Sequence, residues 1–343
     1  MNLKAYAIGA LERAPAPDPL LRAGVDFLVA RASQRLRKLP PDSEKNFARE
    51  MDHYPIALCA SEANAQHYEL PPEFFELFLG PRRKYSCCLY DLPASSLAQA
   101  EIRALDETIA RAALADGQRI LELGCGWGAL TLRMAERFPK AFITAVSNSH
   151  GQRRFIEERA RLNGFTNLRV LTADMNDFSI DARFDRIVSV EMFEHMSNWR
   201  RLLASARSWL EAEGRLFIHI FTHCDRPYRF DPDNKDDWIA QHFFSGGVMP
   251  SHGLLRLYAD IFTIEREWRW SGRHYEKTAM DWLSNFDANR SAIDEVLKSV
   301  YASEASVWRA RWRLFFFATA GLFGARGGEE WGVSHFLLRP KEI

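Results

Sequence analysis

The chain has 343 residues, a length that suits one large domain or a core with a smaller unit. Its 45 basic and 45 acidic residues cancel, which leaves no basic footprint for a nucleic-acid partner and favours a small or neutral substrate. Its five cysteines are odd in number and lack the spacing of a metal site, so we expect reduced thiols, a cytoplasmic protein and no metal.

The first predicted element is an amphipathic helix at residues 20–39, within a helical extension of residues 1–66. Two interpretations are open: a helix docked on the domain, which we favour, or a basic helix on a lipid surface with peripheral membrane contact. The start of the chain lacks the apolar run of a signal peptide. The longest apolar stretch, residues 314–323, is about half a bilayer span, so we expect no transmembrane segment.

From residue 117 onward, strand patterns alternate with helix patterns. The predicted strands are 119–123, 142–146, 168–171, 184–190 and 215–221, and the predicted helices are 129–138, 151–162 and 199–210. Such alternation is typical of a parallel sheet with both faces covered. We therefore predict an α/β protein with a Rossmann-like sheet in a domain of residues 67–343, whose core spans about residues 117–225.

The pattern changes after Thr222. A segment rich in aspartate, proline, glycine and aromatic residues precedes a strand at 264–270, a helical region at 278–323 and a last strand at 333–338. We expect the helical insertion, residues 226–326, to form a lid over the carboxyl edge of the sheet. The final strand is then placed at about residues 331–340.

The turn after the first strand of the sheet carries the run Glu-Leu-Gly-Cys-Gly-Trp-Gly at 122–128. Its glycines let bare backbone approach a ligand, and a dinucleotide is one candidate. A dinucleotide enzyme needs an acid about 20 residues later, but the second strand ends in Ser-Asn-Ser at 147–149. The turn instead resembles the S-adenosylmethionine (SAM) loop of Rossmann-like methyltransferases, so we favour SAM over NAD.

Four runs occur together in this order: Tyr-Ser-Cys-Cys at 85–88, the glycine turn at 122–128, Glu-Met-Phe-Glu-His at 191–195 and Gly-Glu-Glu-Trp at 328–331. With them the chain, from about residue 67 to its end, resembles the cyclopropane fatty acid synthase superfamily of SAM-dependent methyltransferases. Within that superfamily it is similar to the coclaurine N-methyltransferase-like branch. The resemblance implies a class I methyltransferase fold, SAM as cofactor and an enzymatic function.

The resemblance also implies which residues bind the cofactor. A short hydroxyl and an amide after the second strand can bond ribose hydroxyls, and an acid with an apolar neighbour after the third can bracket adenine. Trp127 is as consistent with core packing as with a cofactor contact. The predicted cofactor-binding residues are Tyr85, Ser86, Glu122, Gly124, Gly126, Gly128, Ser147, Gln152, Asp174 and Met175.

The predicted catalytic residues, Glu191, Glu194 and His195, follow the fourth strand, at the edge where parallel sheets bind ligands. Their spacing puts them on one side of a helical turn. Two carboxylates and an imidazole can hold and deprotonate an amine, whereas a plain helix-start cluster would only cap and solvate. In the similar branch the counterparts of Glu194 and His195 take the proton and that of Glu191 supports binding. We therefore predict N-methylation of a small, alkaloid-like amine.

A second pattern keeps a lipid substrate open. Cys87, Glu194, His219 and Tyr275 match the positions that hold bicarbonate in cyclopropane synthases. The alternative function is thus methyl or methylene transfer to an unsaturated acyl lipid, with bicarbonate as base. A plain core histidine remains an equal interpretation of His219, and a SAM-binding regulator is a non-enzymatic alternative. The Cys-Cys doublet and the Gly-Glu-Glu-Trp run favour the N-methyltransferase branch.

Overall fold

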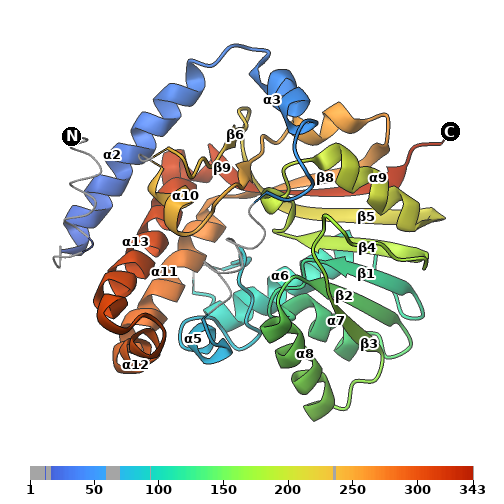
Figure 1. The fold of residues 1–343 in the computed structure, drawn as a ribbon, viewed down its shortest axis with the longest axis horizontal. Helices are drawn as coiled ribbons and strands as arrows, with labels where there is room; N and C mark the ends of the chain where they lie inside the picture. The colour runs from blue at the N-terminus through green and yellow to red at the C-terminus, as the bar shows by residue number, and fades with distance from the viewer. Residues whose placement is uncertain (1–11, 13–16, 59–69, 93, 235–236, 343) are drawn as a thin grey trace.

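The structure is a computed structural model that describes residues 12, 17–58, 70–92, 94–234 and 237–342. Its centre is a seven-stranded sheet in the order β3-β2-β1-β4-β5-β9-β8 (Figure 1). Strands β1 to β5 are parallel, and β9 is antiparallel to both of its neighbours. The predicted α/β, Rossmann-like class is confirmed. The strands are β1 (Arg119–Leu123), β2 (Phe142–Ser147), β3 (Leu168–Thr172), β4 (Phe184–Val190), β5 (Leu210–His223), β8 (Phe262–Ser271) and β9 (Trp331–Pro340).

Helices cover both faces of this sheet, as apolar runs in parallel strands require. Ile120 of β1 packs with α6 and α7, whereas its neighbour Leu121 packs with α9 and α3 on the other face. Helix α8 joins the first group through Ile156, which packs against Ala145 of β2. The helices concerned are α3 (Ser43–Met51), α6 (Leu97–Arg111), α7 (Ala129–Arg137), α8 (His150–Leu162) and α9 (Trp199–Trp209).

Several elements differ from those predicted. Helix α6 was missed, although Ser96 and Gln99 form a capping box at its start. Strand β5 begins at Leu210, before the predicted residue 215, because α9 passes into it directly. The predicted helical region 278–323 is three helices, and the break after α12 lies at Ala302, where φ is +48°. These helices are α11 (Arg273–Ala288), α12 (Arg290–Tyr301) and α13 (Ala305–Gly324).

The segments between β5 and β9 hold the remaining short elements. They form a small two-stranded sheet and single turns of helix beside the large sheet. None of them was predicted, because two to five residues give no readable periodicity. They are β6 (Tyr228–Arg229), α10 (Trp238–His242), β7 (Val248–Met249), η2 (Leu254–Tyr258), η3 (Ala302–Glu304) and η4 (Ala325–Gly328); α5 (Pro72–Glu76) and η1 (Phe193–His195) lie earlier in the chain.

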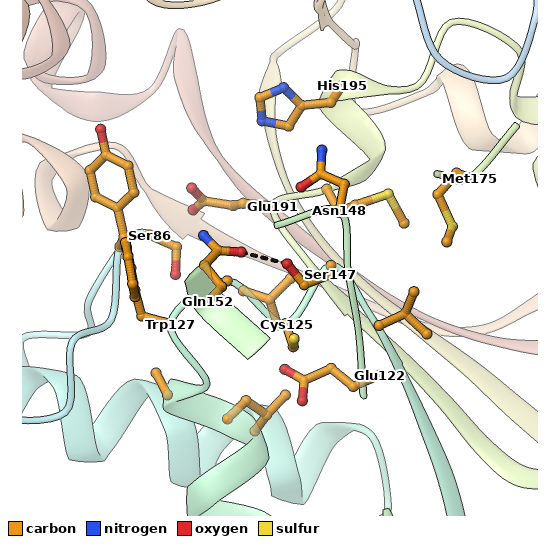
Figure 2. A pocket seen from close by; sticks show the side chains of 18 of the residues that line it. Ser86, Glu122, Cys125, Trp127, Ser147, Asn148, Gln152, Met175, Glu191 and His195 are labelled. Carbon is orange, nitrogen blue, oxygen red and sulfur yellow. Dashed lines mark hydrogen bonds between the residues drawn. The ribbon is translucent and has the colours of Figure 1, made fainter. Parts of the chain in front are cut away.

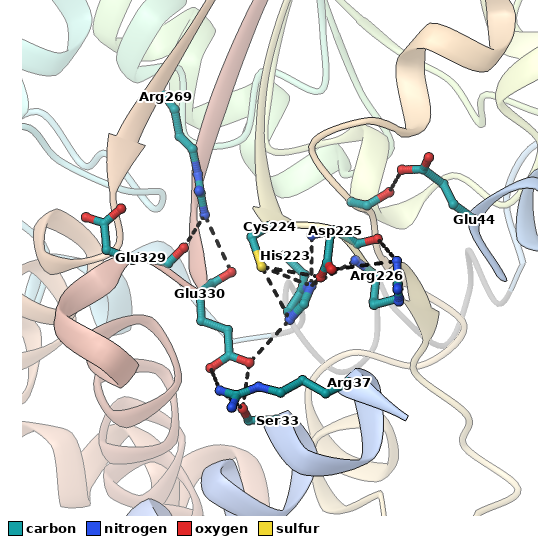
Figure 3. Close-up of polar contacts among 11 residues, drawn as sticks. Ser33, Arg37, Glu44, His223, Cys224, Asp225, Arg226, Arg269, Glu329 and Glu330 are labelled. Carbon is teal, nitrogen blue, oxygen red and sulfur yellow. Dashed lines mark hydrogen bonds and ion pairs between the residues drawn. The ribbon is translucent and has the colours of Figure 1, made fainter. Parts of the chain in front are cut away.

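Helix α2 (Asp18–Arg37) packs along α13 (Figure 1). Ser33 of α2 donates a hydrogen bond of 2.6 Å to Oε1 of Glu330, and Arg37 lies 3.6 Å from Oε2 (Figure 3). The helix is therefore docked on the domain. The predicted boundary at residue 66 lies outside the described residues. Among the helices described, none is both long and apolar enough to cross a bilayer.

Candidate active site

The glycine turn after β1 has three glycines in the left-handed region, with φ of +77° at Gly124, +52° at Gly126 and +79° at Gly128. A Cβ on Gly124 would lie 2.5 Å from Met192, and one on Gly128 would lie 2.6 Å from Ile156. A Cβ on Gly126 would meet no atom within 4 Å, and Gly126 lines a cavity at this edge of the sheet. Gly124 and Gly128 therefore serve packing, while Gly126 keeps the cavity open.

Glu122 lies beneath this turn at the end of β1 (Figure 2). Its Oε2 accepts a hydrogen bond of 2.5 Å from the hydroxyl of Thr131 in the first turns of α7. The side chain is 2% exposed, and burial raises the pKa of Glu122 to about 8. Glu122 therefore joins the strand to the helix around the turn as well as lining the cavity.

Ser147 and Gln152 meet at the cavity (Figure 2). The Ser147 hydroxyl donates to Oε1 of Gln152 over 2.7 Å. This leaves Nε2 of Gln152 buried and without a hydrogen-bond partner among the described residues. Such a donor fits a ligand hydroxyl. Asp174 and Met175 line the same cavity, and so does Asn148, which the sequence patterns did not single out.

The segment before α6 lines this cavity through Tyr85 and Ser86, two of the predicted cofactor-binding residues. Its anchor is Glu101 of α6, whose carboxylate accepts hydrogen bonds from the backbone amides of Arg82, at 2.9 Å, and Lys84, at 3.1 Å. The buried ammonium of Lys84 donates to the Ser86 hydroxyl over 2.5 Å. Sequence reasoning missed Lys84, and its only signal was its place beside the Tyr-Ser-Cys-Cys run.

Trp127 packs in the core and also lies at the cavity. The ring is 3% exposed and packs against Phe75, with centroids 4.8 Å apart, and against Phe155 at 5.6 Å. It also lines the cavity.

Glu191 follows β4 and is held by groups from three other segments. Its Oε1 accepts hydrogen bonds from the Cys87 amide at 2.9 Å and from Nε2 of His219 at 3.2 Å. Its Oε2 accepts one from the Tyr275 hydroxyl at 2.7 Å. We call these three donors the carboxylate cradle. They are three of the four residues that the resemblance assigned to bicarbonate, and in the structure they bind the chain's own Glu191.

The carboxylate cradle favours a charged Glu191. Burial raises the pKa of Glu191 above its usual value, and Lys84, the Cys87 amide and Tyr275 reduce that rise without cancelling it. Burial and the Glu191 charge raise the pKa of Tyr275 well above its usual value, so its hydroxyl keeps the proton that it donates. Burial also raises the pKa of the Cys87 thiol, which is therefore no source of negative charge.

Glu194 takes a different direction from the one predicted. Glu194 and His195 lie in the single turn η1, whereas Glu191 precedes that turn with φ of +46°, so the three do not share one side of a helix. Glu194 is fully buried, and its Oε1 accepts a 2.8 Å hydrogen bond from the backbone amide of Phe221 in β5. Burial, together with the Glu191 charge, raises the pKa of Glu194 well above normal. The pair therefore ionises first at Glu191.

His195 lines the cavity together with Glu191 (Figure 2). Its ring packs against Phe244, with centroids 4.4 Å apart. Burial lowers the pKa of His195 to about 4, while the Glu191 charge acts in the opposite direction. At neutral pH the imidazole is uncharged and can accept a proton.

A cluster at the end of β5 has ligand types that suit a metal. His223, Cys224 and Asp225 place one ligand atom each within 4.8 Å of the others. However, Nδ1 of His223 already accepts hydrogen bonds from the backbone amides of Asp225, at 3.2 Å, and Arg226, at 2.9 Å (Figure 3). The other ring nitrogen lies 3.6 Å from Glu330. The ring therefore serves to fix the docking of α2.

Comparison with known proteins places this geometry in a family. The family model for mycolic acid cyclopropane synthetase matches residues 58–326, most of the chain. The chain is 34% identical to (S)-coclaurine N-methyltransferase of Thalictrum flavum subsp. glaucum over 301 residues, 86% of this chain and 83% of that protein. It is 29% identical to cyclopropane-fatty-acyl-phospholipid synthase of Escherichia coli K12 over 270 residues, 78% of this chain and 66% of the synthase.

Solved structures agree with this placement. A coclaurine N-methyltransferase crystallised with N-methylheliamine and S-adenosylhomocysteine superposes with a TM-score of 0.93 at 32% identity, over 97% of this chain and 99% of that one. A cyclopropane synthase from Mycobacterium tuberculosis superposes with a TM-score of 0.69 at 25% identity, over 83% of this chain and 99% of that one. The chain therefore belongs to the mycolic acid cyclopropane synthetase family, in its coclaurine N-methyltransferase-like branch, which confirms the resemblance.

Proposed function

We propose that this protein is a SAM-dependent methyltransferase that methylates the nitrogen of a small amine. The observation that carries the proposal is the position of Glu191, whose carboxylate is bound by the Cys87 amide, His219 and Tyr275. A buried anion beside a cofactor cavity attracts a cationic ammonium group. The relatives named as N-methyltransferases support the same substrate class.

The cavity fits SAM by its own chemistry. Gly126 leaves space where any side chain would intrude, and the buried Nε2 of Gln152 lacks a partner among the described residues. We assign the ribose hydroxyls to the Ser147–Gln152 pair, the adenine to Asp174 and Met175, and the amino-acid part to the segment that carries Ser86. When bound, SAM supplies a methyl group on a sulfonium, which needs alignment more than chemical activation.

The free thiols among the described cysteines are in keeping with a cytoplasmic setting.

The proton on the amine must leave before the nitrogen can act as a nucleophile. Glu191 pairs with the ammonium and holds the nitrogen at the cavity. His195 takes the proton from that nitrogen, because its imidazole is uncharged at neutral pH and lines the same cavity. The charge of Glu191 then stabilises the imidazolium, in the direction in which it moves the pKa of His195. Glu194, whose pKa is raised well above normal by burial and by the Glu191 charge, orients the turn through the Phe221 amide.

The lipid alternative fits the structure less well. It needs Cys87, His219 and Tyr275 to hold a bicarbonate ion, but each already binds the Glu191 carboxylate. A second anion there would meet the charge of Glu191 inside a buried site, which is costly without further cations. We therefore propose that the Glu191 carboxylate occupies the position that bicarbonate would hold in the alternative function.

An acceptor assay tests the proposal. Purified protein and methyl-labelled SAM are incubated with 1,2,3,4-tetrahydroisoquinoline, or with vesicles of an unsaturated phospholipid, each with and without added bicarbonate. We expect label on the amine, none on the lipid, and no response to bicarbonate. Label on the lipid alone, stimulated by bicarbonate, would reject the amine proposal. The His195→Ala variant serves as the matched control, because it should still bind S-adenosylhomocysteine while losing turnover.

A further inference from the structure

His219, a donor of the carboxylate cradle, lies beside a second buried histidine, His335, and neither of them lines the cavity. His219 of β5 and His335 of β9 are direct partners in the antiparallel register, and both are 0% exposed. Their ring centroids are 4.5 Å apart. Trp270 of β8 packs edge-on against both rings, at 5.3 Å and 4.4 Å. Burying two imidazole rings costs free energy unless their nitrogens form hydrogen bonds, whereas two apolar side chains could pack at these positions without that cost. The two histidines are therefore candidates for a functional role.

The tautomer of His335 follows from its contact with Arg111. Nδ1 of His335 lies 2.8 Å from NH1 of Arg111, the last residue of α6. A guanidinium has only donors, so Nδ1 must accept and the ring proton lies on Nε2. Burial, aided by the positive charge of Arg111, lowers the pKa of His335 well below its usual range, so the ring is neutral.

The tautomer of His219 follows from Glu191. Nε2 of His219 lies 3.2 Å from Oε1 of Glu191. An ionised carboxylate accepts only, so Nε2 of His219 carries the proton and its Nδ1 is an acceptor. Neither Nδ1 of His219 nor Nε2 of His335 has a hydrogen-bond partner among the described residues. Nδ1 of His219 is thus an acceptor and Nε2 of His335 a donor, on two rings whose centroids are 4.5 Å apart.

We propose that Arg111 and His335 are positioning residues of this site: Arg111 sets the tautomer of His335, His335 favours the Nε2–H tautomer of His219, and His219 in that form stabilises the Glu191 carboxylate. The reverse case shows the coupling. If His335 carried its proton on Nδ1, its Nε2 would be an acceptor like Nδ1 of His219, so both partnerless nitrogens of the two packed rings would carry lone pairs. Moving the His219 proton to Nδ1 would relieve this, and Nε2 would then require a proton from Glu191.

The surroundings of Arg111 support a dedicated role. Its guanidinium lies over the rings of Trp268, at 5.1 Å, and Trp270, at 5.5 Å, and its Nε pairs with Glu107 at 2.8 Å. Its side chain is only 15% exposed, compared with 47% for Arg103, which lies about two turns earlier on α6 and pairs with the same Glu107. Arg103 therefore offers a control that disturbs the surface pair and leaves His335 untouched.

The first test needs no substrate. Nitrogen NMR of the full-length, ¹⁵N-histidine-labelled wild-type protein reports which ring nitrogen carries the proton. We expect the proton on Nε2 in both His219 and His335, with His335 returning signals of both tautomers in Arg111→Met. A proton on Nδ1 of either ring in the wild type would overturn the proposal, even if a variant failed to fold. Because no amine is involved, this outcome is independent of the proposed substrate.

The second test rests on the proposed function and uses tetrahydroisoquinoline as acceptor. The charged and titratable groups around Glu191 are Lys84, Cys87, Glu194, His195, His219 and Tyr275. With all of them intact, Arg111→Met should lower kcat about tenfold near pH 7 and move the acidic limb of the pH profile up by about one unit. Arg111→Lys should recover part of kcat, and kcat of Arg103→Met should equal that of the wild type. The affinity for S-adenosylhomocysteine should be unchanged in all of these variants. An equal loss in Arg103→Met, or an unmoved acidic limb in Arg111→Met, would contradict the positioning role.

Discussion

The Tyr275 hydroxyl donates a 2.7 Å hydrogen bond to Oε2 of Glu191, joining helix α11 to the turn after β4. This contact links two segments 84 residues apart and helps to hold a buried carboxylate in its charged form. Helix α11 is thus part of the site's electrostatics. Glu191 also has φ of +46°, in the left-handed region that residues other than glycine seldom adopt. Such strained backbone is concentrated at functional sites.

Removing that hydrogen bond should change the pH dependence of turnover. In Tyr275→Phe the Glu191 carboxylate loses a donor, so its pKa rises and less of it is ionised at a given pH below neutrality. We expect kcat/KM to fall about tenfold near pH 6 and by less at pH 8, measured as a pH–rate profile. Tyr90→Phe is the control, because Tyr90 bonds Asp281 outside the cavity. An equal loss of kcat/KM at all pH values would mean that Tyr275 contributes to packing and does not affect the ionisation of Glu191.

The two glutamates should respond differently to the same isosteric change. Glu191→Gln replaces an anion by an amide that has one acceptor atom for three donors, so we expect kcat to fall at least about a hundredfold. Glu194→Gln keeps a neutral side chain whose oxygen can still accept from the Phe221 amide, so its loss should be less than about tenfold. Single-turnover rates with saturating SAM measure both. Equal, large losses would show that Glu194 also works as an anion.

Two glycine variants separate cofactor binding from folding. Gly126→Val places a side chain in open space at the cavity, so the affinity for S-adenosylhomocysteine should be abolished in calorimetry. The strain of φ +52° should cost about 1–2 kcal/mol of unfolding free energy. Gly128→Ala drives a methyl group to 2.6 Å from Ile156 and should destabilise the fold more than Gly126→Val does. Unchanged affinity in Gly126→Val would overturn the assignment of the turn.

Glu122 predicts a pH dependence of stability. The folded-state pKa of about 8 lies above the unfolded value near 4.5, so between these values the folded chain holds more protons. Its contribution to the unfolding free energy therefore falls as pH rises from about 4.5 to 8 and is level above that. Glu122→Gln removes this loss, so its stability relative to wild type should improve by on the order of 2 kcal/mol between pH 5 and pH 8 in urea titrations. A constant difference across that range would show that Glu122 titrates normally.

Features carried by short sequence runs could be predicted, whereas contacts between segments that are distant in the sequence could not. The glycine turn, Glu191 and His195 were found because each lies in a run whose spacing carries its chemistry. Cys87, His219 and Tyr275 were also found, yet their meeting at Glu191 depends on how three distant segments pack.

Other parts of the site left no local signal. Arg111 and His335 are 224 residues apart and belong to no motif. The prediction that Glu191, Glu194 and His195 share one side of a helical turn was wrong, because Glu191 has a left-handed backbone and the helical turn begins only at Phe193. Helix α6 was not predicted although Ser96 and Gln99 form a capping box at its start, because the alternation of strand and helix patterns begins only after it, at residue 117.

Chemical rescue measures the central claim most directly, namely that the Glu191 carboxylate is the fixed anion of this site. Glu191→Ala keeps the Cβ and backbone but empties the carboxylate cradle. With tetrahydroisoquinoline as acceptor, it should retain about 1% or less of wild-type kcat and regain activity saturably with added formate or acetate, while the wild type ignores these anions and bicarbonate. A wild type that requires bicarbonate, or a Glu191→Ala variant that turns over normally without any added anion, would contradict it.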